Sequence, residues 1–198
     1  MLFSMMKKSV AALVAISALA LVPAANAVPP KELRDVKLDQ SIDTNGSKLV
    51  LNGAGVRSKF FIKAYIASLY LQNPSKDSEQ IMAADEPMAV RLNITSGMIT
   101  PERMSDSTRD GFIKSTGGNV APIEKDMEKL ISVFSESVEK GDIFDLIYTP
   151  GTGVEVFRNG EKKSEVPGLA FKKALFGIWL SEDGIQDSLR EAMLDIED

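Results

Sequence analysis

The chain has 198 residues, a formal net charge of −5 and neither histidine nor cysteine. Without these two residue types the sequence excludes a Ser–His–Asp triad, a thiol nucleophile and the usual zinc sites, so any catalysis would rely on Arg, Lys, Tyr, carboxylates or bound water. An acidic chain without basic clusters also argues against nucleic acid and anionic membrane surfaces as partners. We therefore expect no metal, no cofactor and no nucleic-acid partner.

The first 27 residues have the pattern of a secretory signal peptide. Two lysines precede an apolar run over Val10–Val22, and Ala25-Asn26-Ala27 supplies the small residues of a cleavage site. The apolar run is shorter than the roughly 20 residues of a membrane-spanning helix, although an uncleaved anchor is the alternative. We therefore expect export to the periplasm, a mature chain that begins at Val28, and a single domain over residues 28–198 with no integral membrane segment.

A long β-hairpin is predicted after an edge strand and turn over residues 34–47. Two apolar, β-prone runs, Leu49–Val56 and Phe60–Leu71, flank a short polar break at residues 57–59. This is the pattern of a hairpin whose strands are long and largely buried.

Two glycines and an arginine make the first strand of this hairpin a candidate binding site. Gly53 and Gly55 leave a trough where a ligand or another backbone can come close. Arg57 is in phase with both glycines and with Leu49 and Leu51, so an unbroken strand points it toward the apolar face. Because a guanidinium is a fixed cation with five donors, it suits a carboxylate or an enolate oxygen. The sequence thus predicts an anion-binding floor within an apolar sheet.

The rest of the chain predicts four more strands and five helical segments. Strands are expected at residues 88–95, 143–148, 154–158 and 161–166, and helical segments at 78–84, 101–115, 122–139, 169–180 and 185–196. Thr100 is the expected N-cap of the segment at 101–115, and Asn159-Gly160 is the expected turn between the last two strands. The helix at 101–115 has few large apolar residues, so only a narrow stripe of it can pack.

The sequence resembles the chalcone isomerase family, in its bacterial exported branch. The residues that carry the resemblance are GAGVR at 53–57, followed by FFIKAYIASLYL at 60–71. Near the C-terminus, FKKALFGIWLSEDGIQDSLREAML is similar to the closing helix–turn–helix of that family, and the likeness covers roughly residues 30–195. It implies an α+β fold, an open-faced sandwich in which helices pack on one face of a large antiparallel sheet.

The resemblance also implies roles for two residues. Arg57 matches an arginine that lines the ligand cleft in chalcone isomerases and is thought to hold the carboxylate in their fatty-acid-binding relatives. Tyr65 aligns with a threonine that helps to orient the ligand in the plant enzymes. A three-residue loop at 57–59 would place Tyr65 on the face of Arg57 and a two-residue loop on the opposite face, and the sequence leaves both open.

Other positions depart from the enzymes. Ile178 and Trp179 stand where the plant enzymes have a Thr–Met pair, and the tyrosine and asparagine of their water network have no counterpart here. Trp179, Phe60 and Phe61 are expected to pack in the core. These departures suit the binding of an apolar ligand better than the cyclisation of a polyphenol.

The favoured function is therefore non-catalytic binding of a small amphipathic acid, such as a fatty acid, by Arg57, Tyr65, Gly53 and Gly55. Two alternatives stay open. One is an isomerase, an intramolecular lyase of the chalcone isomerase type, in which Arg57 stabilises an oxyanion. The other is a structural or partner-binding protein whose cleft is filled by its own side chains.

Overall fold

The structure is a computed structural model that describes residues 31–44 and 46–196, so the expected signal peptide lies outside the described residues. Within them the chain forms a seven-stranded sheet in which each strand pairs antiparallel with the next along the chain. The strands are β3 (Ser41–Thr44), β4 (Ser47–Lys59), β5 (Ile62–Leu71), β6 (Met88–Ile94), β7 (Ile143–Thr149), β8 (Gly153–Arg158) and β9 (Glu161–Val166). A separate hairpin of β1 (Lys31–Leu33) and β2 (Val36–Leu38) precedes the sheet.

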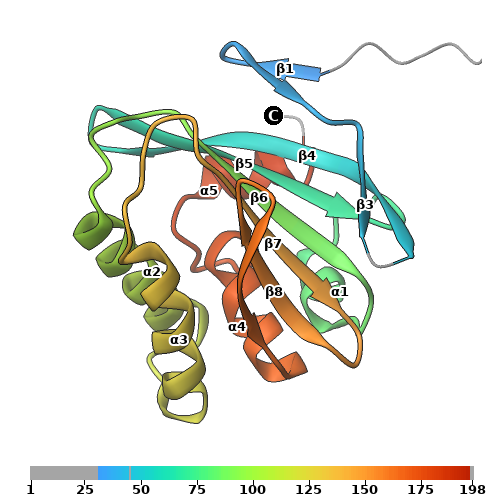
Figure 1. Ribbon diagram of the computed structural model, residues 1–198. Coiled ribbons are helices and arrows are strands. Elements are labelled where there is room, and N and C mark those ends of the chain that lie inside the picture. The colour runs from blue at the N-terminus through green and yellow to red at the C-terminus, as the bar shows by residue number, and fades with distance from the viewer. Residues whose placement is uncertain (1–30, 45, 197–198) are drawn as a thin grey trace, which may run out of the picture.

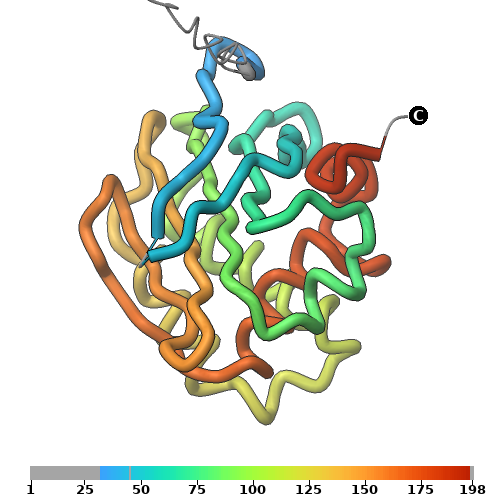
Figure 2. The backbone as a smooth tube through the Cα atoms, turned by 90° about the vertical axis from the view of Figure 1, so that its right-hand side faces the viewer, coloured from blue at the N-terminus to red at the C-terminus, as the bar shows by residue number. Residues whose placement is uncertain are grey.

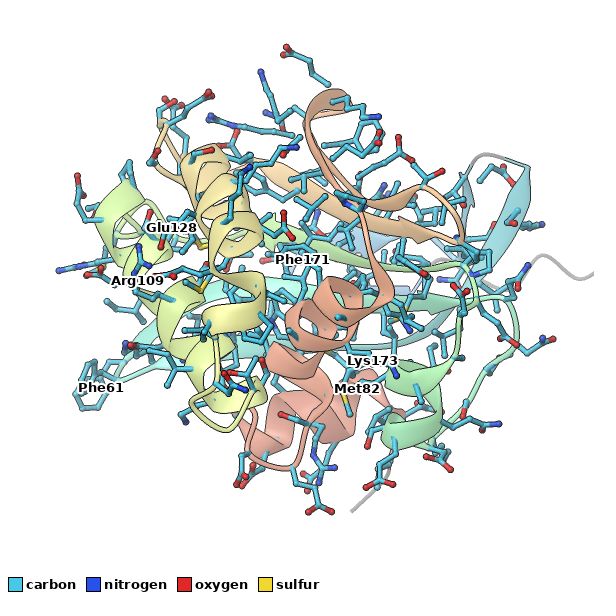
Figure 3. All side chains as sticks on the ribbon, turned by 90° about the horizontal axis from the view of Figure 1, so that it is seen from below. Phe61, Met82, Arg109, Glu128, Phe171 and Lys173 are labelled. Atoms are coloured by element: carbon cyan, nitrogen blue, oxygen red, sulfur yellow. The ribbon has the colours of Figure 1, made fainter. Side chains whose placement is uncertain are left out.

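The helices pack on one face of this sheet (Figure 1). They are α1 (Ser78–Ala83), α2 (Pro101–Ser115), the 3-10 turn η1 (Ala121–Ile123), α3 (Glu124–Phe134), α4 (Leu169–Leu180) and α5 (Asp187–Met193). In the view turned by 90°, α5 (red) lies beside the hairpin of β4 and β5 (Figure 2). An ion pair between Arg109 and Glu128 joins α2 to α3 (Figure 3). The expected α+β architecture, with helices on one face of an antiparallel sheet, is confirmed.

The main core lies between the inner face of the sheet and the helices. It contains apolar side chains from strands and helices alike, among them Leu69, Val90, Phe112, Leu130, Phe144, Phe171 and Leu175. Fully burying a side chain of this size contributes roughly 1.5–3 kcal/mol. Because the chain has no cysteine, this packing takes the place of disulfides. None of the described helices is long and apolar enough to cross a membrane.

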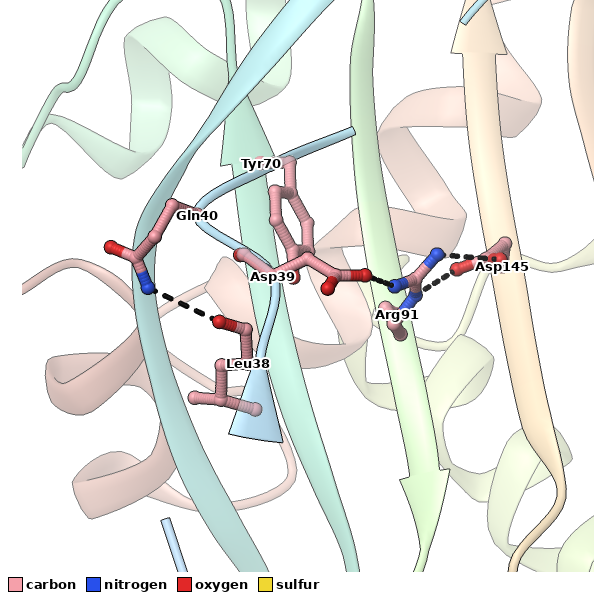
Figure 4. A network of polar contacts seen from close by, with 6 residues as sticks. All are labelled: Leu38, Asp39, Gln40, Tyr70, Arg91 and Asp145. Atoms are coloured by element: carbon pink, nitrogen blue, oxygen red, sulfur yellow. Dashed lines mark hydrogen bonds and ion pairs between the residues drawn. The ribbon is translucent and has the colours of Figure 1, made fainter. Parts of the chain in front are cut away.

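The opposite face of the sheet carries a smaller apolar cluster and a polar contact with the segment before β3. Arg91 on β6 forms ion pairs of 2.6 Å with Asp145 on β7 and with Asp39 (Figure 4). The hydroxyl of Tyr70 donates to the carbonyl oxygen of Asp39 at 3.1 Å. These contacts hold Asp39 against the outer face.

Helix α2 begins where its capping residues predict. Thr100 has extended backbone angles and its hydroxyl accepts from the backbone N–H of Arg103 at 3.3 Å, with Pro101 in the first turn. Helix α3 is shorter than expected, because it ends at Phe134 rather than near residue 139. Val138 is still buried, although it lies after the helix, so tertiary packing rather than the helical stripe explains its apolar character.

The central hairpin turns later than its polar residues suggest. Residues 57–59, which were expected to form the break, belong to β4, and Phe60 and Phe61 form the turn. Lys59 pairs directly with Ile62 across this two-residue connection. The expectation that both phenylalanines pack in the core is therefore wrong, since both are exposed.

Candidate functional site

Arg57 reaches the helix-facing side of the sheet because β4 contains a β-bulge. Leu49 and Leu51 belong to the apolar cluster on the outer face, whereas Gly53 faces the helices. The pairing with β5 shifts between Leu51 and Gly53, which leaves Asn52 as an extra residue. An extra residue reverses the alternation of side chains along a strand. The prediction that Arg57 shares a face with the two leucines is therefore wrong, because it assumed an unbroken strand.

The side chain of Asn52 connects the bulge to two neighbouring segments. Its Nδ2 donates to the carbonyl oxygens of Ser75 at 3.0 Å and Met193 at 2.9 Å. Its Oδ1 accepts from the backbone N–H of Ser75 at 2.8 Å. The amide thus binds both the loop after β5 and the end of α5, and each of its bonds satisfies a polar group at or near the buried bulge.

The trough at Gly53 and Gly55 is filled by α5. A Cβ at Gly53 would lie 2.3 Å from the carbonyl oxygen of Ala192, and one at Gly55 would lie 2.9 Å from Cδ1 of Leu189. The glycines thus allow the close approach of another backbone, which was one of the two uses expected of the trough. Neither glycine lines the cavity described below. We correct their expected role as ligand contacts and assign both to the packing of α5.

The guanidinium of Arg57 is fixed through one of its nitrogens. Nη1 donates to the carbonyl oxygens of Ser58 and Ile185, each at 3.1 Å, and to Oε1 of Gln186 at 3.2 Å. The Gln186 side chain also accepts from the backbone N–H of Ser58 and donates to the carbonyl oxygen of Val56. These bonds connect the segment before α5 to the end of β4.

The other nitrogens of this guanidinium remain available. Among the described residues, Nη2 and Nε of Arg57 have no protein acceptor, and Arg57 forms no ion pair with a carboxylate. Arg57 is half-buried, its guanidinium is held in one orientation, and no carboxylate of the described residues balances its positive charge. It can offer two parallel N–H groups to a carboxylate.

Tyr65 lies directly opposite Arg57 on β5, and both side chains line the same cavity. The hairpin has the two-residue length that was considered, but the loop is at residues 60–61 rather than within 57–59. A second bulge, between Arg57 and Ser58, places Tyr65 on the face of Arg57 instead of the opposite face. The hydroxyl of Tyr65 accepts from Nε1 of Trp179 at 3.1 Å. Burial raises the pKa of Tyr65, and the bond from Trp179 and the charge of Arg57 oppose this shift only in part. The raised pKa favours the neutral phenol, which can donate a hydrogen bond.

These residues line a cavity of about 330 Å³ between the sheet and the helices. Its inner part is apolar and is formed by buried side chains: Leu92, Phe134, Leu175, Ile178 and Trp179. Its mouth is formed by exposed or half-buried residues of the end of β4, the β4–β5 turn, the loop after β6 and the start of α2: Lys59, Phe60, Met98, Arg103, Asp106 and Ser107. Arg57 is half-buried and lies on β4 two residues before Lys59, between these two parts. The volume is at the lower end of the ~300–1,000 Å³ usual for small-molecule sites.

The sequence matches the chalcone isomerase-like family over residues 30–195. The chain belongs to the chalcone isomerase-like family. A crystal structure of a fatty-acid binding protein from Arabidopsis thaliana has a similar fold, with a TM-score of 0.65 and 19% sequence identity over 81% of this chain and 92% of that chain. No curated protein matches the sequence.

In this chalcone isomerase-like chain, sequence reasoning missed the contribution of α2 to the cavity. Met104 and Thr108 line it from successive turns of that helix. At Gly111 a Cβ would lie 2.8 Å from Cγ2 of Ile178, so the glycine allows α4 to pack closely against α2. The sequence signal for this contribution was the narrow apolar stripe of α2. A helix with few large side chains cannot fill the space between itself and the sheet, so a cavity remains there.

Trp179 has two roles, of which only one was expected. It is buried in the core, as predicted, and it also lines the cavity and donates to Tyr65. Ile178 lines the same cavity.

Among the described residues, no group of three or more acidic side chains could hold a metal ion.

Proposed function

We propose that this protein is exported and binds a small amphipathic carboxylate, such as a fatty acid, without catalysing a reaction. The observation that carries the proposal is the arginine without a carboxylate partner beside an apolar cavity. A buried or half-buried cation requires a compensating charge, and among the described residues no carboxylate supplies one to Arg57. A ligand carboxylate would fill this role. The fatty-acid binding protein of similar fold supports this assignment.

The cavity also orients such a ligand. The carboxylate would bind Nη2 and Nε of Arg57 and accept a hydrogen bond from Tyr65, while the hydrocarbon chain would extend toward Leu92 and Phe134. Charge-assisted bonds of this kind are stronger than neutral ones, and the apolar walls contribute roughly 25 cal/mol for each Å² of ligand surface removed from water. The polar end would thus remain near the mouth and the apolar end would be buried.

Binding fits the site better than either alternative. An isomerase needs a group that accepts or delivers a proton near the ligand. The raised pKa of Tyr65 keeps its phenol neutral, and Ile178 and Trp179 surround it with apolar surface. A structural role with a filled cleft disagrees with an open cavity of about 330 Å³.

Arg57→Ala is expected to weaken fatty-acid binding by roughly ten- to a hundredfold, because a hydrogen bond to a charged group contributes about 1.5–3 kcal/mol. Arg57→Lys should recover only part of the affinity, since an ammonium cannot reproduce the bidentate fork. Titration calorimetry with a fatty acid and with the matching fatty alcohol would measure both effects. The alcohol should bind the wild type and the two variants with similar affinity.

Two controls accompany this measurement. Arg103→Ala removes another arginine of the cavity lining, one that is exposed, and should change acid affinity by less than about threefold because an exposed charge is screened. Thermal unfolding of each variant is needed, because Nη1 of Arg57 also joins β4 to residues 185–186 and its loss should cost about 1 kcal/mol. Equal losses of acid and alcohol affinity would show that Arg57 acts only on the structure.

Export has its own test. The signal-peptide pattern of the first 27 residues, with Ala25-Asn26-Ala27 before the cleavage site, supports a mature chain that begins at Val28. The expected result is an intact mass for residues 28–198 in protein isolated from the cell envelope. A mass that retains residues 1–27 in that fraction would contradict cleavage.

A further inference from the structure

Three apolar side chains project into solvent beside the mouth of the cavity. Phe60 is 88% exposed, Phe61 is fully exposed and Met98 is 58% exposed. Phe61 extends beyond the ribbon at the edge of the molecule (Figure 3). Phe60 and Met98 both line the mouth. The hydroxyl of Thr95, three residues before Met98, donates to the carbonyl oxygen of Lys63 at 3.0 Å and so joins the loop that carries Met98 to the hairpin that carries the phenylalanines. We refer to Phe60, Phe61 and Met98 as the apolar tip.

The backbone at the tip is strained for the residue that it carries. Phe60 has a φ of +55°, in the left-handed region that bulky side chains disfavour. Another two-residue hairpin turn, Asn159-Gly160 between β8 and β9, has positive φ at both positions and the residues that such turns prefer. An exposed phenylalanine at this position is not stabilised by burial in the core, and its left-handed backbone conformation costs free energy. Strain of this kind indicates a function for the side chain.

The charge around the tip has the opposite sign to that of the chain. Residues 47–71, which comprise β4, the turn and β5, contain Lys48, Arg57, Lys59 and Lys63 and no acidic residue, although the chain as a whole has a net charge of −5. Lys59 and Lys63 flank the phenylalanines, are exposed, and form no ion pair with any described residue.

A further cation lies on the other side of the tip. Nη1 of Arg103, at the start of α2, donates to the carbonyl oxygen of Met98 at 2.8 Å. Asp106 is the acidic residue of the cavity lining, and it lies about one helical turn further along α2. The tip is thus apolar at its centre and is bordered by three cations, Lys59, Lys63 and Arg103, with Glu102 and Asp106 beside the last of them.

We propose that the apolar tip, together with Lys59, Lys63 and Arg103, docks on a lipid bilayer that carries anionic headgroups. Aromatic rings partition into the interface between headgroups and acyl chains, and lysine and arginine beside them attract anionic lipid. Docking places the mouth of the cavity against the bilayer. The proposal concerns the surface alone and does not depend on the identity of the ligand.

Co-sedimentation with vesicles tests this proposal. The chain without residues 1–27 is used, because the apolar run at 10–22 would bind vesicles by itself and the described sheet and helices all lie after it. Vesicles of equal parts phosphatidylcholine and phosphatidylglycerol should bind the protein, vesicles of phosphatidylcholine alone should bind it far less, and added salt should weaken the binding.

Two double variants separate the apolar from the cationic contribution. Phe60→Gly with Phe61→Ser should reduce partition at least about tenfold. This variant relieves the positive φ at residue 60 and replaces two exposed side chains, so its Tm should not fall, and thermal unfolding separates lost binding from unfolding. Lys59→Gln with Lys63→Gln should reduce partition roughly 20- to 30-fold, at about fivefold for each charge. The matched control is Lys48→Gln with Lys76→Gln, which removes two exposed lysines at the far end of the hairpin and should leave partition within about twofold.

Three outcomes would overturn the proposal. The wild type could fail to sediment with anionic vesicles, or the Gly–Ser variant could bind them as well as the wild type does. Self-association in the absence of lipid that the Gly–Ser variant abolishes, without vesicle binding, would instead indicate a second copy of the chain on this surface. A protein that binds fatty acid in solution but no vesicles would refute docking and leave the proposed function intact. A protein that binds vesicles but no fatty acid would refute the proposed function and leave docking intact.

Discussion

Gly53→Ala is expected to lower the free energy of unfolding by about 3 kcal/mol, a fall of about 10 °C in Tm for a domain of this size. The added Cβ would lie 2.3 Å from the carbonyl oxygen of Ala192 and 2.6 Å from that of Met193. Both are backbone atoms, so no side-chain rotation can relieve the clash and α5 must move away from the sheet. Thermal or urea unfolding followed by circular dichroism measures the change.

This displacement should also affect the candidate site. Residues 185 and 186, which immediately precede α5, hold Nη1 of Arg57. A shift of α5 should therefore loosen the guanidinium and weaken fatty-acid binding together with stability. Gly97→Ala is the matched control, because its Cβ would have no neighbour within 4 Å and its φ is not left-handed. That variant should be unchanged or up to about 1 kcal/mol more stable, since alanine restricts the unfolded chain. A wild-type Tm for Gly53→Ala would contradict the close packing of α5.

Lys172→Met is expected to destabilise the protein by a similar amount, about 3 kcal/mol. Lys172 on α4 is fully buried, and its Nζ donates to the carbonyl oxygens of Ile81 at 2.7 Å, Met82 at 3.1 Å and Ala84 at 2.8 Å. These carbonyls lie at the end of α1, where the helix itself provides no donors. Methionine matches the shape of lysine but leaves three acceptors unpaired. Lys173→Met, at the exposed neighbouring position (Figure 3), should stay within about 0.5 kcal/mol of the wild type.

The same lysine gives a pH dependence that Lys172→Met should remove. Burial lowers the pKa of Lys172 from 10.5 to about 8, helped by the neighbouring charge of Lys173. Between about pH 8 and pH 10.5 the unfolded chain therefore holds a proton that the folded protein has released, and stability rises with pH wherever the unfolded state binds more protons. The stability difference between the wild type and Lys172→Met should widen as pH rises from 8 toward 10. A difference that stays constant over this range would show that the folded lysine keeps an ordinary pKa.

Predictions from local sequence were correct where local interactions decide the structure. Thr100 and Pro101 predicted the start of α2, and Asn159-Gly160 predicted the turn between β8 and β9. The order of strands and helices, together with the family resemblance, predicted the α+β architecture. The helix start and the turn depend on residues a few positions apart, which is the range over which capping and turn preferences act.

Predictions for the site depended on contacts between distant parts of the chain, and several of them needed correction. Asn52 shows why: its side chain bonds Met193, 141 residues away, and the bulge that it occupies reverses the face of every residue after it in β4. An alternation of period two carries no record of such a bulge. Net charge likewise carries no record of where charges lie, since an average of −5 conceals a central hairpin that has only cations.

The sequence by itself determined the excluded chemistries and the family, and it singled out Arg57 as the candidate anion-binding residue, since these depend only on which residues are present and on their local order. The tertiary structure alone decided that α5 fills the glycine trough, that Tyr65 lies opposite Arg57, and that Phe60 and Phe61 are exposed. The physical reason is that a register shift or a close helix contact is set by the free energy of packing segments far apart in the chain. No local pattern of residue types records that free energy.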